Sequence, residues 1–232
     1  MDEQQELITD IVLSRPVPFR LGKRRFMLYP ETLGTSILIS NMLQPLGIEH
    51  EIMTINPTLE TMRLCTLYPE KVSEIIAIAT LPADECLNAV KVKKRAAIFS
   101  ADMDRDDMVQ MLMMILSRSR WHRLTCILGL TKEQEEQRLI ARLKMKSSGT
   151  RQYGGKSVFG TLLDTACSRY GWTDRYVIWE IPLDRLRMML ADSVTSVYLT
   201  EEERQALHIY NDDEFIDGDT ADIETLREMT RN

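Results

Sequence analysis

The sequence predicts a mainly α-helical fold, a helical domain with a short β-hairpin near its N-terminus. Three observations lead to this prediction. Apolar residues recur at three- and four-residue spacing along most of the 232 residues, which is the period of one face of a helix. Apolar and polar residues alternate clearly in one stretch, VPFRLGKRRFMLYP. Prolines and glycines stand where the helical patterns start or stop.

Residues 1–16 are predicted to form an N-terminal helix or arm. Leu7, Ile8, Ile11 and Val12 fall on one side of a short amphipathic helix, which Pro16 and Pro18 stop. The arm is expected to be a short segment leading into the larger domain.

Residues 17–148 are predicted to hold the hairpin and a helical region. Two short runs meet at Gly22-Lys23, the spacing of a tight hairpin whose first turn residue must tolerate positive φ. Arg20, Lys23, Arg24 and Arg25 make the hairpin basic. These side chains either form a solvated strand face or contact an acidic partner.

The helices that follow are bounded by prolines, glycines and capping residues. In chain order, they run from after Pro30 to before Pro45 and Gly47, from Thr58 to Leu81 with a break at Pro69, from Ala83 to Phe99 after Pro82, and onward from about Asp102. Arg118 and Arg120 follow the last of these, as the helix dipole favours. Residues 121–130 are a mainly apolar connector, and Thr131 with Gln134 forms a capping box that starts a helix at Lys132.

A methionine-rich line, MVQMLMMIL, lies in the helix that begins near Asp102. Met108, Met111 and Met114 fall within it. They either pack in the core or form a pliable groove for a partner helix or peptide, because methionine side chains repack readily.

Residues 149–210 are predicted to form a C-terminal helical region with an aromatic elbow. One helix runs from Ser157, its N-cap, to Tyr170, and Gly171 ends it. Its apolar stripe comprises Val158, Leu162, Thr165 and Ala166. Pro182 opens another helix, on which Leu183, Leu186, Met189 and Leu190 share a face.

The elbow between these two helices is a short aromatic and β-branched run from Trp172 to Ile181. Trp172, Tyr176 and Trp179 either pack in the elbow or anchor a protein partner, since aromatic residues are enriched in interface hot spots. Thr200 with Glu203 forms a second capping box. Residues 211–232 are an acidic tail, expected to be weakly ordered.

Composition narrows the classes of partner. Hydrophobic residues make up 44% of the chain, enough for a substantial core, and the formal net charge is −6. Nucleic acid and anionic membranes need a positive field, so neither is expected as a partner. The longest apolar runs, such as residues 75–81, are far shorter than the ~20 residues of a membrane span. The acidic start MDEQQEL is unlike a signal peptide, so we expect a cytoplasmic location.

No catalytic, cofactor or metal site is expected. Gly154-Gly155-Lys156-Ser157 resembles the end of a P-loop, but Thr150 stands where that motif needs its first glycine. Four cysteines and three histidines lack the common zinc spacings. A nucleophile pair of Cys126 with His122 is still open, as are the dispersed carboxylates Glu180 and Asp184.

Two segments resemble the tail assembly chaperones of tailed bacteriophages and prophages. The first, GKRRFMLYPETLG, is similar to their pattern G-K-x-[FY]-x-L-x-P-x-T-L-G. The second surrounds Tyr170-Gly171-Trp172 and continues to Trp179-Glu180-Ile181-Pro182-Leu183. Together they cover about a quarter of the chain. The matched residues of the first segment are Gly22, Lys23, Phe26, Leu28, Pro30, Thr32, Leu33 and Gly34.

The resemblance implies a non-enzymatic helical protein of the host cell cytoplasm. Such a protein binds the tape measure protein, keeps its long apolar helices soluble and helps tail tube subunits assemble, without a cofactor. Two alternatives stay open, a structural component of a virion or phage-like injection machine and an enzyme with phosphate chemistry at Lys156 and Ser157. Self-association into a homo-oligomer is open as well.

Overall fold

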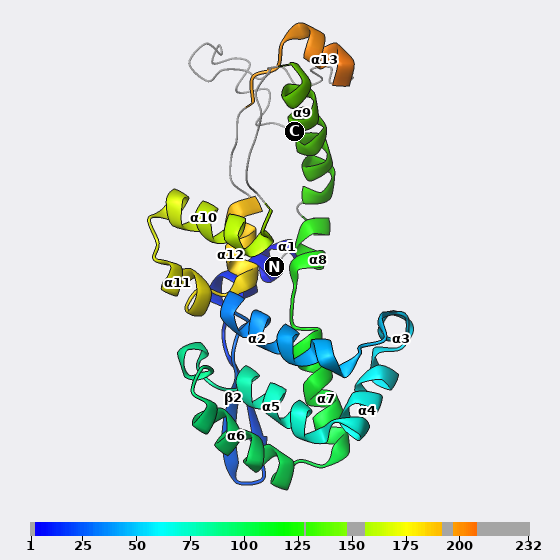
Figure 1. Ribbon diagram of the computed structural model, residues 1–232, viewed down its shortest axis with the longest axis vertical. Coiled ribbons are helices and arrows are strands. Elements are labelled where there is room, and N and C mark those ends of the chain that lie inside the picture. The colour runs from blue at the N-terminus through cyan, green and yellow to red at the C-terminus, as the bar shows by residue number, and fades with distance from the viewer. Residues whose placement is uncertain (1–2, 128, 148–155, 192–196, 208–232) are drawn as a thin grey trace. The chain divides into compact units, whose positions relative to one another are not determined.

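The computed structural model describes residues 3–127, 129–147, 156–191 and 197–207 (Figure 1). The described chain is mainly helical, with a two-stranded antiparallel hairpin near the N-terminus, as predicted. It divides into two compact units, Met1–Glu133 with Tyr153–Val194, and Gln134–Gln152 with Thr195–Asn232. The predicted boundary at residues 148 and 149 and the acidic tail 211–232 lie outside the described residues.

The first unit holds the hairpin and most of the helices. Its elements are α1 (Glu3–Leu13), β1 (Val17–Leu21), β2 (Arg24–Leu28), α2 (Leu33–Leu43), η1 (Gln44–Leu46), α3 (His50–Ile55), α4 (Pro57–Leu67), α5 (Pro69–Ala79), η2 (Ala83–Glu85), α6 (Ala89–Asp102), α7 (Arg105–Leu116), α8 (Trp121–Ile127), α10 (Val158–Tyr170), α11 (Asp174–Trp179) and α12 (Leu183–Ala191). Helix α9 (Leu130–Ser147) begins in this unit and continues into the second, which also holds α13 (Glu201–Leu207).

The hairpin forms as its alternation predicts. Gly22 makes the turn with a φ of 56°, and Phe19 pairs with Phe26 across the strands. The two rings stack at 5.5 Å, and Phe26 lies 4.9 Å from the ring of Phe99 on α6. The other side of the hairpin carries Arg20 and Arg25, whereas Arg24 lies at the turn end on the face of Phe26 and forms an ion pair with Asp102 at 3.1 Å. The apolar side of the hairpin is therefore part of the main core.

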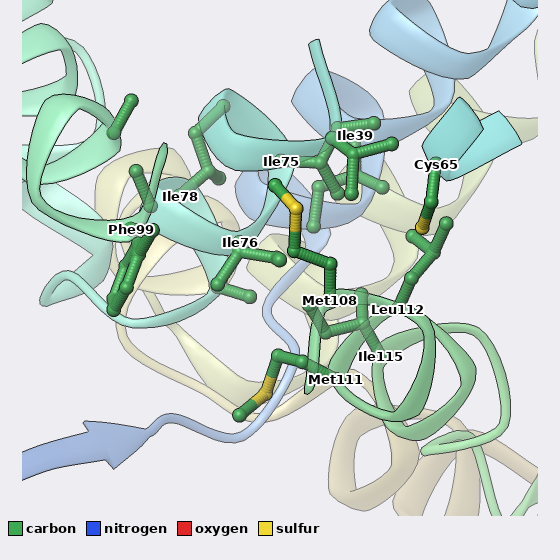
Figure 2. Packing of buried hydrophobic residues seen from close by; sticks show 14 of the residues in the cluster. Ile39, Cys65, Ile75, Ile76, Ile78, Phe99, Met108, Met111, Leu112 and Ile115 are labelled. Carbon is green, nitrogen blue, oxygen red and sulfur yellow. The ribbon is translucent and has the colours of Figure 1, made fainter. Parts of the chain in front are cut away.

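Helix α5 is the centre of that core. It contacts α2, α4, α6 and α7, and Val72, Ile75, Ile76 and Ala77 on it are completely buried. Figure 2 shows Ile75 and Ile76 facing Met108, Met111 and other side chains of α7. A helix that is apolar on nearly all sides must be covered by neighbours, so the surrounding helices pack on α5.

Two smaller apolar clusters lie beside the main one. Leu7 and Ile11 of α1 pack with Leu124 of α8, so the predicted N-terminal arm is packed within the first unit. Ala166, Val177, Ile181 and Leu186 form a second cluster among α10, α11 and α12. Helix α11 also contacts α2, which links this cluster to the first part of the chain.

A buried ion pair fixes the turn between α2 and α3. Glu60 of α4 is fully buried and accepts hydrogen bonds from Arg63 at 2.6 and 2.8 Å and from the backbone N–H of Glu49 at 3.0 Å. Arg63 also donates to the carbonyl of Gly47 at 2.7 Å. The hydrogen bonds from Arg63 hold the pKa of Glu60 below its ordinary value.

The predicted helix from Ala83 to Phe99 is wrong at its start. Residues Ala83–Glu85 form only the short η2 turn, and α6 begins at Ala89. The side chain of Asn88 accepts hydrogen bonds from the backbone N–H groups of Val90 and Lys91. Asn88 is thus the N-cap, and such a cap ends any continuous helix that would pass through it.

The connectors on either side of the predicted helices are themselves helical. Residues predicted as the apolar connector form α8, and α9 begins at Leu130, so Thr131 lies inside the helix and not at its N-cap. The aromatic elbow likewise contains a helix, α11. Its N-cap is Thr173, whose hydroxyl oxygen accepts a hydrogen bond from the backbone N–H of Tyr176. Short apolar runs do not distinguish a helix from a strand or a loop by periodicity alone.

The predicted bounds of α10 and the predicted start of α13 are confirmed. Ser157 accepts the backbone N–H of Gly160, and Gly171 ends α10 with a φ of 65°. Val158, however, is 79% exposed and does not belong to the buried stripe. In the second unit, Thr200 and Glu203 form the predicted capping box. The Glu203 carboxylate also pairs with Lys144 of α9 at 2.7 Å, so it joins α13 to α9.

Candidate functional site

The two segments that carry the family resemblance lie side by side in the first unit. Thr32 caps α2 in a reciprocal capping box with Thr35, and both residues are buried. Thr32 also forms an isolated antiparallel β-bridge with Pro182. The backbone N–H of Leu183 donates to the carbonyl of Glu31 at 2.7 Å. The start of α2 and the turn before α12 therefore form one structural junction.

A close contact between Gly34 and Trp179 completes this junction. A Cβ atom built on Gly34 would lie 2.4–2.7 Å from three atoms of the Trp179 six-membered ring. No side chain fits at that distance, because real carbon–carbon contacts begin near ~3.5 Å. The position requires glycine since the indole ring lies directly on the helix backbone. Through this contact, Gly34 and Trp179 join the two segments.

The aromatic elbow is a stacked group whose members are half-buried. Tyr170 and Trp172 stack at 4.6 Å between ring centroids, and Trp172 meets Tyr176 edge-on at 5.2 Å. The hydroxyl of Tyr170 donates to the carbonyl of Met189 on α12 at 3.0 Å. Trp172 and Tyr176 thus pack against neighbouring rings and are still partly exposed. One face of Trp179 covers Gly34.

The methionine line does not form a groove along its whole length. Met108 and Met111 lie in the main core (Figure 2) and are only 6% and 7% exposed, whereas Met114 is 45% exposed. The groove interpretation is therefore wrong for Met108 and Met111. Their side chains face α5, whereas Met114 lies roughly 120° around the helix from Met108, at the edge of this contact, and is partly exposed to solvent.

A cavity with a volume of about 280 Å³ lies beside the junction, within the first unit. The end of α1, the end of β2, the segment between α7 and α8, and the start of α12 enclose it. Its charged lining residues are Asp10, Arg15, Glu31, Arg118, Arg120 and Asp184. Pro16, Pro30 and Pro182 contribute rigid apolar walls.

Most of the cavity's charged groups pair with one another. Arg120 pairs with Asp10 at 2.8 Å. Asp184 accepts hydrogen bonds from the backbone N–H of Arg120 at 2.7 Å and from the Ser119 hydroxyl at 3.2 Å. Asp184, one of the dispersed carboxylates of the sequence, therefore holds the segment between α7 and α8 onto α12.

Arg118 lies in an ion pair with Glu31, but two of its nitrogen atoms form no hydrogen bond within the described residues. Its side chain is 11% exposed and lies 3.5 Å from Glu31, measured from Nη2 to Oε1. Among the described residues, neither Nε nor Nη2 of Arg118 has a hydrogen-bond partner, although both atoms are buried. In the sequence, Arg118 is recognisable only as a charge that follows a helix. No local signal could reveal its burial, because the walls come from four separate parts of the chain.

The residues that the sequence suggested for catalysis lie on α8, at the start of α10, after α11 and on α12. Cys126 Sγ lies 4.0 Å from His122 Nε2, one helical turn away on α8, and both side chains are exposed. Lys156 and Glu180 are exposed, and Ser157 serves as the cap of α10. Gly154 and Gly155 lie outside the described residues. The structure thus brings Cys126 and His122 close together on the exposed side of α8.

In the parts of the chain that the structure describes, no group of three or more His, Cys, Asp or Glu side chains is arranged to hold a metal ion. Across the same residues, none of the helices combines the length and apolar character needed to cross a membrane.

Comparison of the chain with protein-family models, with curated proteins and with solved structures finds no match.

Proposed function

We propose that this chain is a non-enzymatic tail assembly chaperone of a tailed phage or prophage. In this role it binds the tape measure protein in the host cytoplasm and assists assembly of the tail tube. The observation that carries the proposal is the junction of Gly34 with Trp179. Two segments that resemble the chaperones separately, and lie far apart in the sequence, meet there as one structural unit. Such a meeting is expected if both belong to one inherited fold element.

The surface of the first unit offers side chains suited to a helical partner. Leu59 and Met62 are 54% and 38% exposed and lie three residues apart on α4, and Met114 projects from the neighbouring α7. Residues three apart share a helix face. An apolar stripe on a partner helix can be covered by such side chains, and methionine adapts to stripes of different shape.

The test is co-expression of the chain with the tape measure protein, which we expect to be a long helical protein encoded by a neighbouring gene. We expect that protein to be recovered soluble and to co-purify with the tagged chain. Met114→Lys should weaken its recovery, because the ammonium group interrupts an apolar contact. Leu139→Lys on α9 is the matched control, since Leu139 is 53% exposed and lies in the second unit.

Two results would contradict the proposal. If the long protein is equally soluble with and without the chain, there is no chaperone activity to explain. If the chain is found in purified mature particles, it is a structural component of the particle.

A further inference from the structure

The β-hairpin keeps backbone groups that are free to pair with another strand. In an antiparallel pair, hydrogen-bonded and non-hydrogen-bonded residue pairs alternate, and the backbone groups of the non-hydrogen-bonded residues point away from the pair. Leu21 and Arg24 flank the two-residue turn and form a hydrogen-bonded pair. In the observed register, the residues with outward backbone groups are therefore Pro18, Arg20, Arg25 and Met27. Among the described residues, no third strand pairs with either edge.

The two edges of the hairpin differ. On β1, Pro18 has no N–H and cannot donate to a further strand. On β2, Arg25 and Met27 each keep an N–H and a C=O group, and none of these forms a hydrogen bond with another described residue. The free part ends at Tyr29, whose N–H donates to the carbonyl of Ala79 at 3.0 Å. The β2 edge thus offers four backbone groups in a row to one short extended segment.

The side chains beside this edge carry uncompensated positive charge. Arg20 and Arg25 lie directly opposite each other on the face of the hairpin away from Phe26, and both are exposed. In the described chain neither forms an ion pair, whereas Arg24 pairs with Asp102. Like charges directly opposite each other destabilise a sheet, and residues 17–28 contain no acidic residue to offset them. A carboxylate on an added strand would be attracted to both arginines.

The edge and its charges together select one kind of occupant. A second copy of this chain is disfavoured, because two β2 strands paired edge to edge would bring the arginines of both copies together. Nucleic acid would be attracted by the charge, but its phosphates only accept hydrogen bonds and would leave the two carbonyl groups of the edge unpaired. An extended polypeptide supplies both donors and acceptors at the spacing of a strand.

We propose that the β2 edge binds an extended acidic segment of a partner protein, which adds as a third strand through the backbone groups of Arg25 and Met27. Successive side chains of a strand point to opposite faces. Acidic residues at alternate positions of the segment therefore lie on the same face as Arg20 and Arg25. The proposal goes beyond the tail assembly role and is independent of it, because it concerns only the hairpin.

The experiment measures amide hydrogen exchange by NMR in the ¹⁵N-labelled full chain, with and without the peptide acetyl-Thr-Glu-Val-Glu-Val-Glu-Thr-amide. In the free chain, the N–H groups of Phe26 and Leu28 point to β1 and should exchange slowly, whereas those of Arg25 and Met27 should exchange fast. We expect saturable binding with a dissociation constant on the order of 100 μM. At saturation, exchange at Arg25 and Met27 should slow by about tenfold or more.

Three comparison ligands separate backbone pairing from charge. Acetyl-Thr-Gln-Val-Gln-Val-Gln-Thr-amide keeps the backbone but lacks the charge, and we expect it to bind about tenfold more weakly. The acidic peptide with N-methyl groups on its Glu and Val residues keeps the charge but cannot donate backbone hydrogen bonds, so it should not protect the two amides. Oligo(dT) of ten nucleotides tests binding to a polyanion and should not protect them either.

A charge-reversal variant tests the two arginines. Arg20→Glu with Arg25→Glu should lose binding of the acidic peptide by about tenfold or more and should instead prefer acetyl-Thr-Lys-Val-Lys-Val-Lys-Thr-amide. Both side chains are exposed, so we expect the fold to be kept. Arg175→Glu, at an exposed position of α11, is the matched control and should bind the acidic peptide as the wild type does.

The proposal is wrong if the acidic peptide leaves exchange at Arg25 and Met27 unchanged, or if the N-methylated peptide binds as tightly as the unmodified one. Protection of these two amides that grows with the concentration of the chain alone would identify a second copy as the occupant. Tighter binding of oligo(dT) than of the acidic peptide would assign the surface to nucleic acid. If the double variant does not fold, the comparison of ligands on the wild type still decides the question.

Discussion

The indole ring of Trp179 occupies the space in which residue 34 would place a side chain. Three ring atoms lie 2.4–2.7 Å from the position of a Cβ on Gly34. The ring therefore rests on the backbone of α2, and the turn before α12 is held against the start of that helix. Two more interactions join the same segments: the β-bridge of Thr32 with Pro182, and the hydrogen bond from the backbone N–H of Leu183 to the carbonyl of Glu31.

We expect Gly34→Ala to lower the free energy of unfolding by about 1–3 kcal/mol, the usual cost of overpacking. Without the contact, alanine in a helix would be more stable than glycine by about 0.5–1 kcal/mol. Urea denaturation of both proteins measures the difference. Gly160→Ala on α10 is the control, because its added Cβ would meet Ser157 at 3.3 Å only, and we expect a change within about 0.5 kcal/mol.

The double variant Gly34→Ala with Trp179→Leu tests the cause. If the indole ring is the obstacle, the alanine should cost little once the ring is removed, so the two changes will not be additive. If the free-energy costs of the two changes simply add, the indole ring is not what makes alanine unfavourable at position 34.

Met111→Lys and Met114→Lys should differ sharply in stability. Met111 is 7% exposed and faces α5, so a lysine there leaves an unpaired charge in the core, at a cost of about 3–5 kcal/mol. Met114 is 45% exposed, and its lysine variant should stay within about 0.5 kcal/mol of the wild type. Thermal unfolding followed by circular dichroism separates the two, and equal melting temperatures would contradict the burial of Met111.

Glu60 should make part of the protein's stability depend on acid pH. Its pKa in the folded chain is lowered, chiefly by the hydrogen bonds from Arg63, from an ordinary value of 4.5. The unfolded chain therefore binds a proton more readily. The contribution is fully present above pH 4.5 and is lost as the pH falls through the lower folded pKa.

Glu60→Gln should reduce stability at neutral pH and make the loss of stability below pH 4.5 shallower. Urea midpoints measured from pH 7 to pH 3 give the comparison. Glu74→Gln, which alters a surface pair with Lys71, should leave the acid slope close to that of the wild type. Parallel curves for the wild type and Glu60→Gln would show that Glu60 does not carry the effect.

The four cysteines, all free thiols, should react with iodoacetamide at different rates. Burial raises the pKa of Cys65 and of Cys86 to about 11. At pH 8, only about one molecule in a thousand then carries the reactive thiolate at either position. Cys126 is exposed and Cys167 is half-buried, so we expect Cys126 to be labelled first and Cys167 next.

Peptide mapping by mass spectrometry after timed labelling measures these rates. Labelling in 6 M guanidinium chloride is the control, and there all four thiols should react. Native-state labelling of Cys65 or Cys86 as fast as Cys126 would contradict the buried positions of these two thiols.

Much of the local structure could be predicted because its causes are local. The hairpin turn depends on Gly22 and its neighbours, the start of α10 on Ser157 and Gly160, and the start of α13 on Thr200 and Glu203. Each of these interactions joins residues within four positions of one another. The helix predicted from Ala83 would run through Asn88. The Asn88 side chain instead caps a helix that begins at Ala89, so the predicted start was wrong.

The candidate site could be predicted only in part. The sequence identified the resembling segments and the residues Trp172, Tyr176 and Trp179, but it contained no signal that Trp179 lies on Gly34. The sequence pattern also did not distinguish Met108, Met111 and Met114 from one another. In the structure, Met108 and Met111 are buried against α5 and Met114 is exposed.

By itself, the sequence determined the helical class, the hairpin and most helix ends, because periodicity and capping act over one or two turns of chain. Only the tertiary structure decided which methionines are buried, which glycine carries the Trp179 ring, and that Arg118 lies in a cavity with two donors unused. These features depend on contacts between segments that are distant in sequence. Such contacts are set by how all the apolar faces pack together at once, and no short stretch of residues specifies that arrangement.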